Sequence, residues 1–331
     1  MALNSNRLHQ RLMHFENLEE RRLMAGSVDI RLDGANLEVT GTADRDKISV
    51  YYDDSGQTIH VKTYDYLDAY GWVEAQHREF DADDISFIRI RGAGSDDIIY
   101  NATEINSEIY GGAGNDWIYG GAGVDSIYGK DGDDTIYGNG GNDYLRGDDG
   151  DDHIKGNRGD DTVDAGTGND YVAGGRGNDI LLGGAGNDTL KGRHGNDFLA
   201  GHSGNDRIYG EGGHDTLLGM EGNDWVVGGH GDDLLKGGSG NDTLLGNLGD
   251  DRLYGEGGTD YLKGQDGNDY LNGGDKYGSD GERDYMWGGT GADTFVQHWH
   301  FGSTGGYRGF VIGYAEEMIY DFNGFAGDRY E

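Results

Sequence analysis

Gly111-Gly112-Ala113-Gly114-Asn115-Asp116-Trp117-Ile118-Tyr119 is the first of eighteen nonapeptides that follow one another without insertion from Gly111 to Asn272. In every copy the fourth residue is Gly, the sixth is Asp and the eighth is Ile, Leu or Val. The first residue is Gly in all copies but one, which has Ala165. A fixed period of this kind predicts a repeat architecture, in which each unit buries its apolar residue only against its neighbours.

The residues within one copy predict a short strand and a long turn. The seventh to ninth residues are enough for a three-residue strand, whose middle side chain faces inward while its neighbours face outward. The other six residues reverse the chain. Gly at the first, second and fourth places is expected to take positive φ and to bring carbonyl oxygens close to a bound ion. The second place is the least demanding, since Lys130, Asn139 and Glu211 occur there.

Two facing nonapeptides make an 18-residue coil with one aliphatic residue on each inner wall, and stacked coils then share a continuous core. The predicted fold is therefore all-β, a parallel β-roll or β-helix. One wall is expected to hold Ile118, Ile136, Ile154, Val172, Leu190, Ile208, Val226, Leu244 and Leu262. The other is expected to hold Ile127, Leu145, Val163, Leu181, Leu199, Leu217, Leu235, Leu253 and Leu271.

The same stacking places the sixth-place carboxylates in two columns. One column holds Asp116, Asp134, Asp152, Asp170, Asp188, Asp206, Asp224, Asp242 and Asp260, and the other holds Asp125, Asp143, Asp161, Asp179, Asp197, Asp215, Asp233, Asp251 and Asp269. Like charges about 5 Å apart repel by roughly 3 kcal/mol per pair at an effective dielectric near 20. Summed over two columns, this exceeds the roughly 5–15 kcal/mol that stabilises a typical domain. The columns should not close without a counter-ion.

A hard divalent cation between successive loops reverses the sign of this repulsion. Carboxylate and carbonyl oxygens are the ligands that Ca²⁺ prefers, whereas Mg²⁺ retains several waters and fits flexible carbonyl cages poorly. The eighteen Asp side chains are therefore the predicted Ca²⁺ ligands. One such Asp could equally be a turn residue bonded to its own backbone, but eighteen in register favour the ligand interpretation. The fifth-place residues, such as Asn115 and Asp133, are interpreted as turn formers and not as ligands.

The pattern G-G-x-G-x-D-x-U-x resembles the calcium-binding nonapeptides of the repeats-in-toxin (RTX, haemolysin-type) family, in strict register over about half of the chain. The resemblance implies a right-handed parallel β-roll with each ion between loops of adjacent coils, held by sixth-place Asp and loop carbonyls. It also implies an extracellular protein, exported in one step by an uncleaved C-terminal signal.

Composition limits the classes of partner and compartment. The net charge of −36 argues against nucleic acid and anionic membranes as partners. The acidic, weakly hydrophobic repeats meet the conditions for a disordered chain without metal, so we expect folding to be coupled to Ca²⁺. Millimolar Ca²⁺ outside cells suits weak extracellular calcium modules, and the absence of Cys neither requires nor excludes an oxidising compartment. The sequence has no transmembrane run and no apolar secretory leader.

Four segments are expected along the chain: 1–26, a helical or targeting segment; 27–110, a β-hairpin cap; 111–296, the calcium-binding β-roll; and 297–331, a C-terminal cap with a possible secretion signal. Within 1–26, Phe15 to Met24 resembles the F-E-x-L-E-x-R-x-L-L segment at the start of many large bacterial surface proteins. Within 27–110, hairpins precede a degenerate repeat at Gly92 to Ile98, and Asn101 to Asn106 lacks the Gly loop, so no ion is expected there.

Near the C-terminus the repeat register slips by six residues around Lys276, before a last copy at Gly288 to Val296. The stretches Gly291 to Phe295 and Ile319 to Asp328 resemble the flank that closes the roll in the family. The apolar continuation of that flank is missing, so we expect an abbreviated export signal or a truncated protein.

No motif for catalysis is found. The chain lacks H-E-x-x-H, G-x-x-x-x-G-K-[ST] and G-x-S-x-G. His298-Trp299-His300 is metal-like, but two His without a placed third ligand are more often surface residues. Tyr119 and Tyr137, eighteen residues apart, are expected to stack for stability. The leading hypothesis is a secreted or cell-surface, non-enzymatic calcium-binding repeat protein with a structural or interaction role. The alternatives are an accessory module of an extracellular epimerase or hydrolase, and a surface adhesin that binds glycan or ice.

Overall fold

The computed structural model describes residues 28–67, 71–274 and 284–296. The predictions for 1–26, for 297–331 and for the insertion around Lys276 lie outside these residues. The chain divides into two compact units, Met1–His153 and Ile154–Glu331, and each is described by itself.

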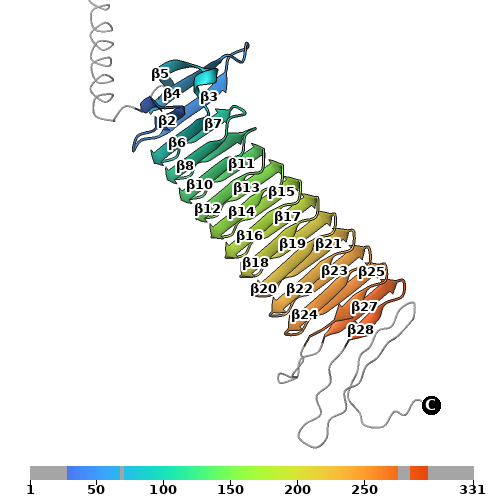
Figure 1. The fold of residues 1–331 in the computed structure, drawn as a ribbon. Coiled ribbons are helices and arrows are strands. Elements are labelled where there is room, and N and C mark those ends of the chain that lie inside the picture. The colour runs from blue at the N-terminus through green and yellow to red at the C-terminus, as the bar shows by residue number, and fades with distance from the viewer. Residues whose placement is uncertain (1–27, 68–70, 275–283, 297–331) are drawn as a thin grey trace, which may run out of the picture. The chain divides into compact units, whose positions relative to one another are not determined.

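The first unit begins with antiparallel hairpins and continues as parallel coils (Figure 1). One sheet runs in the order β1-β2-β6-β8-β10-β12 and the other in the order β5-β4-β3-β7-β9-β11. The elements are β1 (Asp29–Asp33), β2 (Asn36–Thr40), β3 (Asp46–Tyr52), β4 (Thr58–Leu67), β5 (Gly71–Asp81), the 3₁₀ turn η1 (Ala82–Asp84), β6 (Phe87–Gly94), β7 (Ile98–Ala102), β8 (Ser107–Ala113), β9 (Trp117–Gly121), β10 (Asp125–Asp131), β11 (Thr135–Gly140) and β12 (Tyr144–Asp149). The division between the units falls just after the first residue of β13 (His153–Arg158).

The predicted hairpins of the N-terminal segment are present. Strands β1 and β2 pair antiparallel across the turn at Gly34, and β3 pairs antiparallel with β4. Parallel stacking already starts in this segment, because β2 pairs with β6 and β3 pairs with β7 in parallel register. The hairpins therefore lead directly into the roll, and their inward residues Val39, Val50 and Val61 are fully buried.

The second unit consists of parallel strands that alternate between two sheets. Neighbouring strands of one sheet are 18 residues apart up to β26, as in the pairing of Leu217 with Leu235, and 24 apart in the last two pairs. The strands are β14 (Thr162–Thr167), β15 (Tyr171–Arg176), β16 (Ile180–Ala185), β17 (Thr189–His194), β18 (Phe198–Ser203), β19 (Arg207–Gly212), β20 (Thr216–Glu221), β21 (Trp225–His230), β22 (Leu234–Ser239), β23 (Thr243–Leu248), β24 (Arg252–Gly257), β25 (Tyr261–Asp266), β26 (Tyr270–Asn272), β27 (Tyr285–Thr290) and β28 (Thr294–Val296).

The two predicted aliphatic walls are confirmed, since all eighteen eighth-place residues have no exposed surface. Odd-numbered and even-numbered strands carry one wall each, as the coil of two nonapeptides requires. Burying a side chain of this size contributes roughly 1.5–3 kcal/mol. One such residue per nonapeptide makes a thin core. The hydrogen-bonded backbone ladders and the loops therefore contribute an unusually large share of the stability of the fold.

The strands are longer than the three residues predicted from the repeat. A typical strand, Leu234–Ser239, runs from the seventh place of one copy to the third place of the next, with the burial of side chains alternating along it. The first-place Gly237 is therefore a second inward-facing position, and only the fourth to sixth places make the turn. The sequence was misleading here because a Gly-rich stretch is typical of turns, whereas these glycines complete the strand.

Tyrosine side chains stack along the outer face of the first unit. The rings of Tyr119 and Tyr137 lie 4.9 Å apart and nearly parallel, at 10°, which confirms the predicted pair. Tyr100 continues this stack from the preceding coil, 4.5 Å from Tyr119. Tyr110 and Tyr128 make an equivalent pair on the other sheet.

Candidate calcium-binding columns

The sixth-place Asp side chains are the most buried charged groups of the described chain. All eighteen are at most 3% exposed. Within each unit, Oδ1 of one Asp accepts a hydrogen bond from the backbone N–H of the sixth-place residue in the preceding coil, as between Asp134 and the N–H of Asp116 at 2.7 Å. The structure therefore aligns the predicted carboxylates into two columns within each unit.

The second carboxylate oxygen, Oδ2, is left with no hydrogen-bond partner at many of these positions. It is buried and unsatisfied in Asp116, Asp125, Asp134, Asp179, Asp197, Asp206, Asp215, Asp224, Asp233, Asp242, Asp251 and Asp269. A buried polar atom in this state costs about 1–3 kcal/mol, and more if it is charged. Twelve such atoms in register are incompatible with a stable fold, so each needs a proton or a cation.

Burial raises the pKa of these carboxyl groups. The pKa of Asp116 is raised to about 7, that of Asp134 and Asp251 to about 8, and that of Asp242 to about 6, in each case chiefly by desolvation. In Asp134, repulsion from the neighbouring Asp raises the pKa by less than desolvation does. The hydrogen bond from the backbone N–H of Asp116 lowers the pKa. Like-charge repulsion, which the spacing predicts, is therefore the smaller of the two costs at Asp134, and desolvation is the larger. Because desolvation depends on burial, the larger cost could not be predicted from spacing alone.

The first-place glycines leave room for the second carboxylate oxygen. A Cβ on Gly201 would lie 2.1 Å from Oδ2 of Asp206, and a Cβ on Gly246 would lie 2.2 Å from Oδ2 of Asp251. A carbonyl of the adjacent coil lies beside the same point, as Gly264 O does at Gly246. Each column therefore presents buried carboxylate oxygens next to backbone carbonyl oxygens.

The expected reason for glycine was wrong at the first place. Positive φ occurs at the second and fourth places, for example 104° at Gly184 and 137° at Gly186, and not at the first-place Gly183. The first-place residue faces inward, so it is small because the carboxylate fills that space. At the second place non-Gly residues also adopt positive φ, such as 75° at His202.

These donors fit a hard divalent cation. Oxygen ligands from carboxylates and carbonyls are the set that Ca²⁺ takes, and charge on the ion would offset the desolvation that raises the pKa of each Asp. The unsatisfied Oδ2 atoms are the groups that would hold the ion, while the Oδ1 atoms keep the coils in register.

The chain matches the family described as RTX calcium-binding nonapeptide repeat (4 copies) at residues 101–136, 121–154, 137–172, 146–181, 173–208, 209–244, 245–275 and 278–296. These matches cover more than half of the chain. It belongs to the RTX family. No curated protein matches the chain.

The RTX columns extend beyond the eighteen predicted residues. Asp97 is 1% exposed, and its N–H donates to Oδ1 of Asp116 at 2.7 Å, while its own Oδ2 is buried without a partner. Asp46 follows in the same ladder, with its N–H donating to Asp97. Both are sixth residues of degenerate nonapeptides that begin at Gly92 and Gly41. The copy at Gly92 was recognised as degenerate but its Asp97 was not assigned as a ligand, and the copy at Gly41 was missed. In these two copies Ser95 and Asp44 stand where the others have Gly.

The last coil also joins the RTX columns. Oδ1 of Asp293 accepts from the N–H of Asp269, and Oδ1 of Asp284 accepts from the N–H of Asp260. The separation is 24 residues instead of 18, which is the predicted six-residue slip. The last copy therefore resumes the repeat. In the first unit, Ser107 lies where an Asp would precede Asp125, and its hydroxyl donates to Oδ1 of Asp125.

The fifth-place residues connect coils and do not simply cap their own turns. Oδ1 of Asn115 accepts from the N–H of Asp133 in the next coil at 3.0 Å, and Oδ1 of Asn205 accepts from the N–H of Asn223 at 2.7 Å. In this ladder the accepting side chain lies in the earlier coil, whereas in the ladder of the sixth-place Asp it lies in the later coil. A neutral Asn serves as well as Asp here because the site needs only an acceptor, which explains why both occur.

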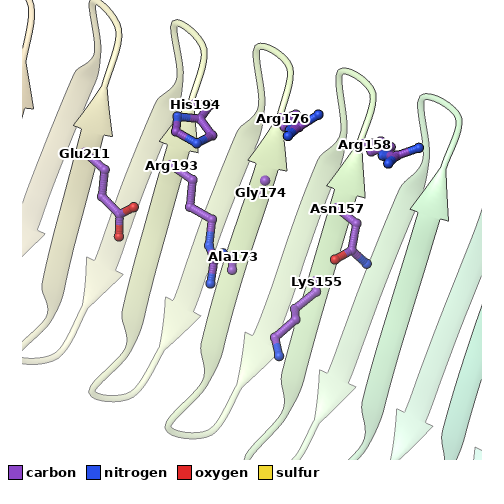
Figure 2. A pocket seen from close by; sticks show the side chains of 10 residues that line it. Lys155, Asn157, Arg158, Ala173, Gly174, Arg176, Arg193, His194 and Glu211 are labelled. Carbon is purple, nitrogen blue, oxygen red and sulfur yellow. The ribbon is translucent and has the colours of Figure 1, made fainter.

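A basic hollow lies on the second unit. It has a volume of about 500 Å³, and Arg158, Arg176 and His194 project at corresponding ends of its neighbouring strands (Figure 2). Its lining includes the small residues Ala173, Gly174 and Gly175, and Ala173 stands at a ninth place, where Lys155 and Tyr209 stand in other copies. The full lining is Lys155, Asn157, Arg158, Ala173, Gly174, Gly175, Arg176, Arg193, His194 and Glu211. Four cationic side chains and one acidic side chain make this a positively charged patch on a chain of net charge −36.

None of the described segments is a helix long and apolar enough to cross a membrane.

Proposed function

We propose that the chain is an extracellular calcium-binding module whose β-roll forms when Ca²⁺ enters the two carboxylate columns, and that the folded roll has a structural or interaction role without catalysis. The observation that carries this proposal is the set of buried, unsatisfied Oδ2 atoms at twelve of the predicted ligand positions. The eighteen sixth-place Asp residues are the proposed ligands. Asp97 is added to them because its Oδ2 has the same surroundings.

The weak Ca²⁺ affinity that is typical of such modules supports the extracellular compartment. Extracellular calcium modules bind with dissociation constants of about 10⁻⁴–10⁻³ M, so they are filled outside cells and empty inside. A chain that stays unfolded until export and folds outside is consistent with the thin core and the high charge.

A calcium titration followed by far-ultraviolet circular dichroism tests this proposal. We expect a cooperative gain of β-structure on adding Ca²⁺ and none with equimolar Mg²⁺, because Mg²⁺ retains its waters. Mass spectrometry of the folded complex gives the ion number. A spectrum with full β-structure in chelator would refute calcium-coupled folding.

The basic hollow supports a second role, which is adhesion to an acidic surface polysaccharide. Arg158 and Arg176 occupy equivalent places in coils one rise apart, roughly 4.8 Å, and both are exposed. Arginine recognises carboxylates and sulfates through paired N–H donors. This role rests on the cationic side chains of the hollow and not on the tyrosines of the first unit, which stack on one another.

Retention on immobilised polyuronate in calcium, with a neutral glucan as the reference, tests this role. The double change Arg158→Glu and Arg176→Glu should abolish retention, while Arg207→Glu and Arg252→Glu, on other coils of the same unit, should preserve it. Equal loss in both double variants would mean general charge attraction, and no retention of the unchanged protein would rule out adhesion of this kind. Assays for epimerase and hydrolase activity on the retained polymer address the enzyme-accessory alternative.

A further inference from the structure

A cluster of two histidines and one glutamate lies on the outer face of the N-terminal hairpin, apart from the calcium columns. Antiparallel pairing of β4 and β5 sets His60 opposite Glu79, and His77 lies two residues from Glu79 on the same face. Ile59 and Val61, which flank His60, point into the core and are fully buried. Strand alternation therefore directs the three polar side chains outward and together.

Three donor atoms of this cluster surround one point. Nδ1 of His60 lies 2.9 Å from Nε2 of His77, and Oε1 of Glu79 lies 3.5 Å and 3.7 Å from these two nitrogens. A triangle with these sides has a centre about 2.0 Å from all three atoms, which matches the 2.0–2.2 Å of zinc–nitrogen and zinc–oxygen bonds. With bonds of about 2.05 Å, the angles at the ion would be about 90°, 117° and 129°, a distorted tetrahedral arrangement that leaves a fourth position free.

The surroundings hold the cluster in place. The ring of Tyr51 stacks on that of His60 at 5.2 Å and 15°, and the His60 side chain is only 17% exposed. The nearby cation Lys62 is engaged by Glu74, at 3.6 Å. Glu79 is 61% exposed, so the side of the cluster facing solvent is open to a water ligand. In the structure the two imidazole nitrogens lie within hydrogen-bonding distance of each other, and an ion would replace this contact once both rings turn toward the centre.

We propose that His60, His77 and Glu79 form a zinc site, with a fourth position open to water. Imidazole nitrogen selects Zn²⁺ and similar metals, whereas Ca²⁺ takes oxygen ligands, so the site and the columns would fill independently. The ion would join β4 to the edge strand β5 and so fasten the hairpin that precedes the roll.

Zinc binding by the full chain, kept in saturating Ca²⁺, tests the proposal. Zn²⁺ is titrated in competition with a chromophoric chelator, and Co²⁺ substitution reports the geometry through its visible absorption. We expect one tight equivalent and a tetrahedral Co²⁺ spectrum. His60→Gln and His77→Gln should remove this equivalent, and Glu79→Gln should weaken it by at least about tenfold.

The double change His298→Ala and His300→Ala is the matched control. It removes two histidines that are close in the sequence but outside the proposed site, and it should leave the bound equivalent of Zn²⁺ intact. The proposal is overturned if this control loses the equivalent, if His77→Gln binds like the unchanged chain, or if Ca²⁺ displaces the zinc. His77 and Glu79 lie on an edge strand with partly exposed side chains, so their variants answer the question even if His60→Gln impairs folding. Circular dichroism in calcium checks the fold of each variant.

Discussion

At the scale of the residue, the sixth-place Asp performs two tasks with its two oxygens. Oδ1 accepts a backbone N–H and fixes the register of adjacent coils, while Oδ2 lies buried beside first-place glycine and backbone carbonyls. A fifth-place residue performs only the first kind of task. The pair Asp232 and Asp233 places both roles in one copy, since Oδ1 of each accepts a backbone N–H from another coil.

Asp233→Asn should therefore weaken calcium binding, whereas Asp232→Asn should not. Asparagine keeps an acceptor oxygen but removes the charge that the ion needs. We expect Asp233→Asn to raise the calcium midpoint of folding and to lower the free energy of unfolding in calcium by about 1–3 kcal/mol. Asp232→Asn should stay within about 0.5 kcal/mol, as for most exposed sites. Equal effects in urea unfolding would mean that Asp233 acts only through its hydrogen bond.

Glycine is required at the fourth place for backbone reasons. Gly204 has φ of 133°, and an added Cβ would lie 1.6 Å from the carbonyl oxygen of Gly186 in the preceding coil. Gly204→Ala should lower the unfolding free energy by several kcal/mol. Gly212→Ala is the control, because its Cβ would meet only Arg193 O at 3.5 Å. Thermal unfolding in calcium compares them, and a similar Tm for both variants would contradict this explanation.

At the scale of the element, six-residue strands and the side chains stacked on them stabilise the roll, because one buried aliphatic residue per copy is not enough to do so. The Tyr100, Tyr119 and Tyr137 stack runs along one sheet of the first unit. Its middle ring contacts both others, so it should contribute more than an isolated surface aromatic.

Tyr119→Ala should lower the free energy of unfolding by about 1–3 kcal/mol, since two aromatic contacts of roughly 0.5–1.5 kcal/mol each are lost. Tyr261→Ala serves as the control, because Tyr261 is an exposed seventh-place residue. Urea unfolding in calcium measures the difference. An equal effect at Tyr261 would assign the loss to strand propensity instead of stacking.

The period of the repeat was sufficient to predict the two walls. Eighth-place residues 18 apart, such as Leu217 and Leu235, pair within one sheet, and those nine apart fall in different sheets. The first-place glycines were misassigned to turns, because the space that Asp206 Oδ2 occupies at Gly201 is visible only in three dimensions. His60, His77 and Glu79 were not predicted, because the antiparallel register of β4 and β5 that joins them leaves no motif in the sequence.

At the scale of the whole molecule, the raised pKa values make metal-free stability depend on pH. In the folded state the pKa values of Asp242, Asp116 and Asp134 are raised to about 6, 7 and 8, above the ordinary value of 3.8. The folded state therefore keeps protons that the unfolded chain has released, and the free energy of unfolding falls as pH rises from about 4 to about 8.

Metal-stripped protein should consequently gain β-structure when the pH is lowered from about 7.5 to about 5.5, as protons take the place of ions in the columns. In calcium the dependence should reverse, because protons compete with Ca²⁺ for the same oxygens. Circular dichroism at both pH values, with and without Ca²⁺, measures this. A metal-free spectrum that loses β-structure on acidification would contradict burial as the cause.

The central claim is that, at neutral pH, the carboxylate columns permit a compact roll only when divalent cations neutralise them. Hydrogen–deuterium exchange of strands β15 to β25, compared in chelator and in calcium at neutral pH, tests it most directly. We predict strong amide protection in calcium and almost complete exchange within the dead time in chelator. Equal protection in both conditions, with no metal retained, would contradict the claim.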